Sequence, residues 1–141
     1  MSLTGFESGF RLPLGIGIDL VDIEELRSLD ERCSGVFFNR TYTPAEQEEA
    51  GKAADKWSYL AGRFAVKEAA FKALAHLLPD RSFDFRIVET LYDIDGSPVI
   101  TYSEKLAELM SRAGVSAMLV SITNEGPYAA AVVQAVKDLG Q

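Results

Sequence analysis

The fold of this chain depends on residues 57–73, which carry the sequence WSYLAGRFAVKEAAFKA. Apolar side chains recur along this stretch at helical spacing, so we predict a long helix over about 55–78 with one buried face. Pro79 should stop the helix, because proline lacks a backbone donor and has a fixed φ. The apolar face is formed by Trp57, Leu60, Ala61, Phe64, Ala65, Phe71, Leu74 and Ala75.

A short buried strand is predicted before this helix, over residues 14–20, where the sequence is LGIGIDL. Its two glycines would let another backbone come close. Two further helices should separate this strand from the long helix. The first begins after Asp22, a favourable N-cap residue. The second begins after Thr43, with Pro44 at the first helical position and Glu46 completing a capping box.

The remainder of the chain is predicted to be mostly sheet. Asp95-Gly96 is a strong hairpin signal, because both residues accept the backbone conformation of a tight turn. The predicted elements are strands over 83–92, 98–102, 115–123 and 128–136, and a helix over 103–114. The order of elements therefore predicts an α+β domain in which an antiparallel sheet packs on the long helix.

Length and composition indicate an ordinary globular protein. The chain has 141 residues, which predicts one domain over 13–141 after a polar lead-in over 1–12. The hydrophobic fraction is 48% and the charged fraction 25%, both typical of globular proteins. No apolar run approaches the roughly 20 residues of a membrane helix, and no secretory signal is visible. We therefore expect a cytoplasmic protein that does not enter a membrane.

Cysteine content and charge narrow the expected partners. The single cysteine, Cys33, excludes an internal disulfide and fits a reducing compartment. The single histidine, His76, leaves no pair of histidines for a zinc site. The formal net charge is −7, so the chain lacks the positive field that binding to duplex nucleic acid requires.

Three charged residues suggest chemistry. Glu68 and Lys72 are four residues apart and share one face of the long helix, where a plain interpretation is a solvated ion pair. Asp19 ends the apolar strand, and a buried carboxylate needs a partner or a metal. Magnesium takes carboxylate oxygens and adds substrate phosphates. The trio therefore favours a magnesium–diphosphate site, although spacing leaves open whether Asp19 meets Glu68.

Four stretches of the chain are similar to one known family. They are GIGIDLVDI at 15–23, TYTPAE at 41–46, the long-helix sequence at 57–73 and VSITNEGPYAAA at 120–131. In this order and spacing they resemble the motifs of the holo-acyl-carrier-protein synthases, the small 4′-phosphopantetheinyl transferases. The resemblance spans roughly residues 14–136. Its most specific part is the pattern KEAxxK on the long helix.

The resemblance implies a fold, an assembly and a reaction. It implies the α+β fold of that family and a homotrimer whose subunits pack their sheets together, with each active site at a subunit interface. The implied reaction moves the 4′-phosphopantetheine group of coenzyme A to a serine of an acyl or peptidyl carrier protein. It depends on Mg²⁺ and leaves adenosine 3′,5′-bisphosphate.

The resemblance also implies roles for single residues. Asp19 and Glu68 match the two metal carboxylates, and Lys72 matches the lysine near the reacting phosphate. Arg63 and Lys67 match basic positions that face the phosphates of coenzyme A. Of the carboxylates, Glu68 is our choice for the group that takes the proton from the serine, directly or through metal-bound water.

Three features depart from the family pattern. Residues 73–80 contain no glycine where the family has a glycine-rich loop, and Asn124 replaces a histidine in the final hairpin. The first helix is acidic, so a carrier would have to be less acidic than usual or dock through Arg27, Arg32 and Arg40. These features keep two alternatives open. One is a non-catalytic trimer that binds coenzyme A or a partner, and the other is a different enzyme acting on a diphosphate substrate.

Overall fold

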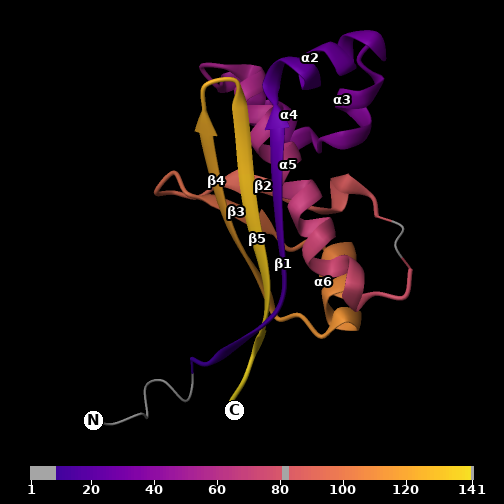
Figure 1. The fold of residues 1–141 in the computed structure, drawn as a ribbon, viewed down its shortest axis with the longest axis vertical. Coiled ribbons are helices and arrows are strands. Elements are labelled where there is room, and N and C mark those ends of the chain that lie inside the picture. The colour runs from indigo at the N-terminus through magenta and orange to yellow at the C-terminus, as the bar shows by residue number, and fades with distance from the viewer. Residues whose placement is uncertain (1–8, 81–82, 141) are drawn as a thin grey trace.

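The computed structural model describes residues 9–80 and 83–140. An antiparallel sheet of three strands forms its centre, in the order β1-β5-β4 (Figure 1). The strands are β1 (Arg11–Asp22), β4 (Ala117–Glu125) and β5 (Tyr128–Asp138). A separate hairpin consists of β2 (Glu89–Tyr92) and β3 (Pro98–Thr101). The predicted α+β class is therefore confirmed, although the strands form two sheets.

Helices cover one side of the central sheet (Figure 1). They are α2 (Ile23–Arg32), α3 (Val36–Thr41), α4 (Pro44–Lys52), α5 (Lys56–Leu74) and α6 (Glu104–Ala113), with short 3-10 turns η1 (Ala75–Leu77) and η2 (Phe85–Ile87). The long helix α5 packs on β1 and β5, while α2 to α4 gather at one end of the molecule. None of the helices in the described ranges is long and apolar enough to cross a membrane.

The contact between α5 and β1 depends on small residues on both elements. Ala69 and Ala73 of α5 are fully buried. A Cβ atom at Gly15 would lie 2.1 Å from the carbonyl oxygen of Ala73, and one at Gly17 would lie 1.9 Å from that of Ala69. Both glycines of the predicted strand are thus required for close backbone approach. This approach brings the end of β1 beside the middle of α5.

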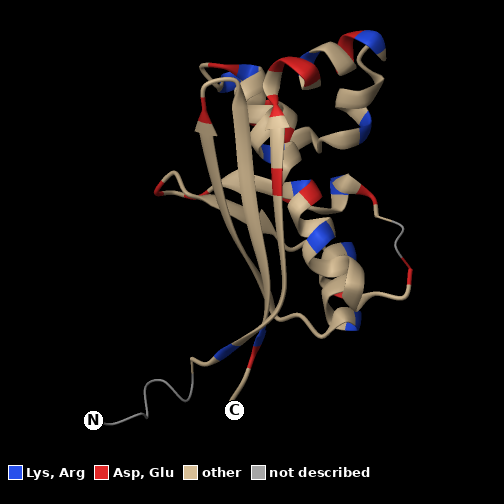
Figure 2. Ribbon diagram, viewed as in Figure 1, with Lys and Arg blue, Asp and Glu red and all other residues tan. Residues whose placement is uncertain are grey.

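The opposite face of the central sheet is exposed and apolar. Residues alternate along β1, so the glycines face α5 and the intervening large residues point away. Strands β4 and β5 carry almost no charge along their length (Figure 2). The exposed apolar residues of this face include Ile16, Ile18, Leu20 and Leu119, with exposed fractions of 66, 68, 65 and 44%. A patch of this kind marks an interaction surface.

Several local predictions are confirmed. The side chain of Asp22 accepts a hydrogen bond from the backbone N–H of Glu25, and Thr43 and Glu46 form the predicted capping box. Helix α6 begins after Ser103 and ends at Gly114, which adopts the left-handed conformation that favours glycine.

Other boundaries differ from the predictions. The strand predicted over 83–92 begins only at Glu89, because the side chain of Asp84 accepts a hydrogen bond from the backbone of Arg86 and turns the chain into η2. The long helix ends at Leu74 and tightens into η1 before Pro79. Helix α3 was not predicted. The predicted lead-in over 1–12 lies mostly outside the described residues, and β1 already includes its last two positions.

Candidate active site

The fold brings Asp19, Glu68 and Lys72 together. The Nζ atom of Lys72 lies 2.9 Å from the carbonyl oxygen of Ile18 and 3.3 Å from Oδ1 of Asp19. The side chain of Asp19 is 17% exposed and that of Lys72 is 50% exposed. Glu68 lines the same groove as Asp19. The question that the spacing left open is thereby answered, because β1 and α5 place both carboxylates in one site.

The environment of Glu68 disfavours its charged form. Burial raises the pKa of Glu68 above its ordinary value, the nearby charge of Asp19 raises it further, and Lys72 opposes both effects. Within the described part of the chain, the carboxylate of Glu68 has no hydrogen bond or ion pair. A divalent cation would remove the repulsion and supply the missing partner, so the pair fits a metal.

The number of ligands indicates which metal fits. Among the described residues, no group of three or more His, Cys, Asp or Glu side chains could hold an ion. Two carboxylates alone suit magnesium, which keeps several waters and completes its shell with substrate phosphates. They do not suit a structural zinc ion, which is normally held by four protein ligands that include Cys or His.

A groove leads from these carboxylates along helix α2. Its volume is about 890 Å³, and Phe64 of α5 forms part of its wall. Its polar lining from the end of β1 and from α2 consists of Asp19, Asp22, Glu24, Glu25, Ser28 and Arg32. Arg27 lies outside this lining and pairs with Glu24 and Glu31. The groove is therefore mainly acidic, and Arg32 is the one basic residue in its lining.

A second pocket, of about 200 Å³, contains Arg63. This side chain is only 3% exposed, and its Nε and Nη2 atoms have no hydrogen-bond partner among the described residues. Leaving buried donors unpaired costs about 1–3 kcal/mol each, which a phosphate oxygen would offset. Asn124 and Ser58 line the same pocket, and Asn124 Nδ2 donates to Ser58 Oγ at 2.9 Å.

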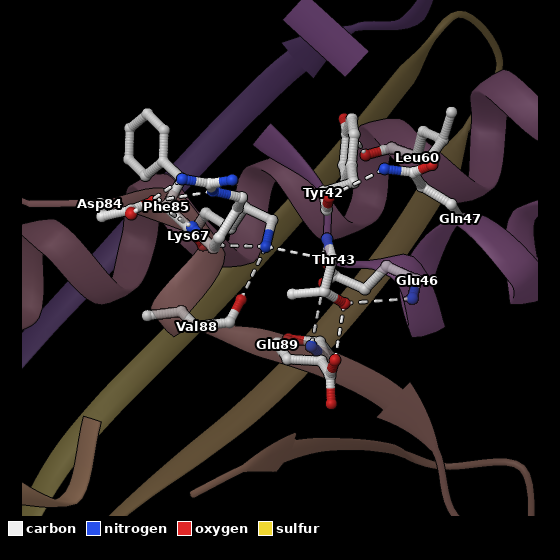
Figure 3. A network of polar contacts seen from close by, with 12 residues as sticks. Tyr42, Thr43, Glu46, Gln47, Leu60, Lys67, Asp84, Phe85, Val88 and Glu89 are labelled. Carbon is white, nitrogen blue, oxygen red and sulfur yellow. Dashed lines mark hydrogen bonds and ion pairs between the residues drawn. The ribbon is translucent and has the colours of Figure 1, made fainter. Parts of the chain in front are cut away.

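The structure contradicts the phosphate-binding role expected for Lys67. Its side chain is fully buried, and Figure 3 shows its ammonium group inside a polar network. Nζ donates to Oε1 of Glu46 at 2.8 Å and to the carbonyl oxygens of Phe85 at 2.9 Å and Val88 at 2.8 Å. Because an ammonium group has three donors, none remains for a ligand.

The two pockets lie at opposite edges of the sheet. The groove with Asp19 adjoins β1, which forms one edge, whereas Asn124 of the second pocket belongs to β4, which forms the other. Arg63 and Glu68 also project from different faces of α5, since five residues separate them. A single chain therefore does not unite the two pockets into one site.

The sequence interpretation missed part of the second pocket. Tyr59 precedes Arg63 by four residues, so helical spacing alone could have indicated their contact. Tyr92 comes from β2, and no local pattern connects it with Arg63. Ser58 gave no signal either, because a single serine near a helix start is common.

Comparisons with known proteins show the family to which this chain belongs. A family model described as the 4′-phosphopantetheinyl transferase superfamily matches residues 15–133. The holo-[acyl-carrier-protein] synthase of Desulforudis audaxviator is 36% identical over 123 residues, covering 87% of this chain and 92% of that protein. The solved structure of the Neisseria meningitidis synthase has a TM-score of 0.80 at 31% identity, covering 88% of this chain and 98% of the other.

A further solved structure contains a ligand. It is the Helicobacter pylori synthase in complex with coenzyme A, with a TM-score of 0.72 at 31% identity, covering 85% of this chain and 98% of that one. The chain belongs to the 4′-phosphopantetheinyl transferase superfamily. Its compared relatives there are holo-[acyl-carrier-protein] synthases, so the predicted family and enzyme class are confirmed.

Proposed function

We propose that this enzyme moves the 4′-phosphopantetheine group of coenzyme A to a serine of an acyl or peptidyl carrier protein, with Mg²⁺ held by Asp19 and Glu68. The products would be the holo-carrier protein and adenosine 3′,5′-bisphosphate. The observation that carries the proposal is the convergence of Asp19, Glu68 and Lys72 at one end of an open groove. A cytoplasmic location is part of the same proposal.

Each of the three residues has a distinct task in this proposal. Lys72 is half exposed beside Asp19, where its charge would stabilise negative charge that develops on the leaving phosphate. Glu68 would accept the proton of the carrier serine, directly or through metal-bound water. Bound Mg²⁺ would neutralise the diphosphate and polarise the phosphorus that is attacked.

The second pocket supports a role for Arg63 toward coenzyme A. A guanidinium with unpaired nitrogens at a small pocket would serve as a receptor for a phosphate group. Asn124 occupies the position of the family's histidine and lies in this pocket, where it can donate a hydrogen bond without exchanging a proton. Asn124 thus preserves a polar contact at this position, although the glycine-rich loop is missing.

The assembly proposed for the enzyme is a homotrimer with active sites between subunits. The exposed apolar face of the central sheet, with Ile16, Ile18 and Leu20 about two-thirds exposed, offers a surface that packing would bury. The groove and the second pocket of one subunit adjoin opposite edges of its sheet. A neighbouring subunit would therefore be needed to place its second pocket beside the groove of this subunit. This arrangement would complete the coenzyme A site.

The wild-type protein should add phosphopantetheine to a carrier. Incubation with coenzyme A, Mg²⁺ and apo-carrier proteins from the same genome should raise the mass of a carrier by one phosphopantetheine group, as measured by mass spectrometry. A Ser→Ala carrier should remain unmodified. Absence of a mass gain on every carrier would refute the transfer. Release of bisphosphate from coenzyme A alone would instead indicate a hydrolase.

Replacing Ile18 by glutamate should break the trimer. Ile18 is 68% exposed on the apolar sheet face, so a charge there would be buried without a partner between subunits. Light scattering after gel filtration should show a smaller species, and transfer activity should fall with it. The control is Ile94→Glu, since Ile94 is fully exposed in the β2–β3 turn. An Ile18→Glu protein of wild-type mass would contradict the proposed interface.

A further inference from the structure

Arg63 is enclosed by two aromatic rings. The centre of its guanidinium group lies 4.0 Å from the ring centroid of Tyr59 and 4.4 Å from that of Tyr92. The two rings also meet edge to face, with centroids 5.8 Å apart. Tyr59 is 6% exposed, and Tyr92 is 52% exposed. The cation therefore lies in the corner formed by a buried inner ring and a half-exposed outer ring that also lines the pocket.

The carboxylate of Glu49 connects the members of this cage. Its Oε1 accepts a hydrogen bond from the hydroxyl of Tyr59, and its Oε2 accepts one from the backbone N–H of Tyr92 at 3.2 Å. Oε1 lies 3.9 Å from Nη2 of Arg63, beyond hydrogen-bonding distance. Glu49 thus provides a compensating charge for Arg63 without occupying its donors.

This arrangement suits the binding of an anion. Aromatic faces attract a cation and exclude water from it, but they do not use its N–H groups, which lie in the guanidinium plane. The cage also restricts the rotamers of Arg63 before a ligand arrives, so less conformational entropy is lost on binding. Nε and Nη2 of Arg63 are unpaired among the described residues but shielded from solvent, so a phosphate would bind them by entering the pocket that Arg63 lines and opening it to these atoms.

We infer that Tyr59, Tyr92 and Glu49 are positioning residues that hold Arg63 as a rigid receptor for a phosphate group of coenzyme A. This inference rests on the proposed function and adds to it the residues that determine how tightly the donor binds. Coenzyme A carries both a diphosphate and a 3′-phosphate, and either would fit a guanidinium edge. The three residues come from α4, α5 and β2, so the receptor forms only in the folded protein.

Tyr92 allows the sharpest test. Its ring covers Arg63, and its hydroxyl has no hydrogen bond in the described part of the chain, so Tyr92→Phe should keep the interaction. Tyr92→Leu retains an apolar side chain but removes the aromatic face. We would measure the Kd for coenzyme A by calorimetry without carrier, and kcat and KM with saturating carrier. Both sets of measurements would be repeated with 3′-dephospho-coenzyme A.

The expected results separate positioning from general damage. Tyr92→Leu should raise the Kd and KM for coenzyme A about tenfold and leave kcat within about twofold, whereas Tyr92→Phe should match the wild type within about twofold. An effect that is lost with 3′-dephospho-coenzyme A assigns the 3′-phosphate to Arg63. An effect that persists assigns the diphosphate.

Other outcomes would overturn the inference. An unchanged Kd for Tyr92→Leu would refute it, even if transfer is normal. Equally weakened binding of coenzyme A in Tyr92→Phe and Tyr92→Leu would also refute the inference, because the aromatic face would then make no difference. If Tyr92→Leu fails to fold, Tyr59→Phe replaces it, since that variant keeps the ring and loses the hydrogen bond to Glu49. We expect Tyr59→Phe to bind coenzyme A about threefold more weakly, and an unchanged Kd would refute the inference. Wild-type binding without transfer would contradict the proposed function alone.

Discussion

Replacing Glu68 by glutamine should abolish transfer while preserving the fold. Glutamine has nearly the same shape but lacks the charge that would hold Mg²⁺ opposite Asp19 and the basicity needed to accept a serine proton. We expect kcat/KM to fall by about 10²–10³-fold or more, the scale of losing one preorganised electrostatic contact. Mass spectrometry of the carrier over time measures this loss. Retained activity would refute the assignment of Glu68 as a metal ligand.

Stability measurements provide a second readout for the same variant. Burial and Asp19 raise the pKa of Glu68 in the fold, so its ionised form is less favourable there than in the unfolded chain. Without metal, Glu68→Gln should therefore be at least as stable as the wild type at neutral pH. This advantage should disappear as the pH falls through the raised pKa to the ordinary value, because the wild-type carboxyl then becomes protonated.

The response to added Mg²⁺ should also distinguish the wild type from Glu68→Gln. Added Mg²⁺ should raise the melting temperature of the wild type, because a ligand that binds only the folded state stabilises it, and it should not raise that of Glu68→Gln. Glu48→Gln is the matched control, since Glu48 is 72% exposed and its one ion-pair partner among the described residues is Lys52. The control should keep wild-type activity and the wild-type response to Mg²⁺.

Replacing Lys67 by methionine should strongly destabilise the protein. The change would leave the buried carboxylate of Glu46 without its cation and the carbonyl oxygens of Phe85 and Val88 without their donor (Figure 3). Breaking a buried ion pair from one side costs about 3–5 kcal/mol. Denaturant unfolding at fixed protein concentration measures the loss. A loss below about 1 kcal/mol would contradict the structural role assigned to Lys67.

Two further variants isolate the cause of the loss. Lys52→Met removes a lysine from the exposed pair with Glu48, so its free energy of unfolding should change by no more than about 0.5 kcal/mol. The double variant Glu46→Gln with Lys67→Met removes both buried charges. It should be more stable than Lys67→Met alone, because no uncompensated charge remains inside the protein.

Glu46 shows how far sequence reasoning extends. The pattern TPAE predicts its capping bond correctly, because the partner Thr43 is three residues away and the geometry is local. The same carboxylate also accepts bonds from Lys67 and from the backbone of Thr90 at 3.0 Å. Those partners are distant in the sequence and carry no shared pattern, so the contacts depend on how α4, α5 and β2 pack together.

Lys67 and Arg63 show why the sequence alone could not assign the roles of all site residues. Both are basic and both lie on α5, so the sequence interpretation gave them the same role toward coenzyme A. In the fold, Lys67 faces α4 and the segment at η2 that precedes β2, and it uses every donor internally, whereas Arg63 keeps unpaired nitrogens at a pocket. Their roles differ because they lie on different sides of α5. Which groups face each side depends on the elements that pack against the helix.

The residues of the segment 57–73 determine its helix by themselves, and the same is true of the helix caps and of the Asp95-Gly96 turn. These features depend on neighbours within about four residues, where backbone geometry is nearly independent of the rest of the fold. The meeting of Asp19 with Glu68 and Lys72 required tertiary structure, because it depends on Gly15 and Gly17 of β1 approaching Ala69 and Ala73 of α5. The cage around Arg63 required it too, because Tyr92 arrives from a strand that begins 26 residues after Arg63, at Glu89.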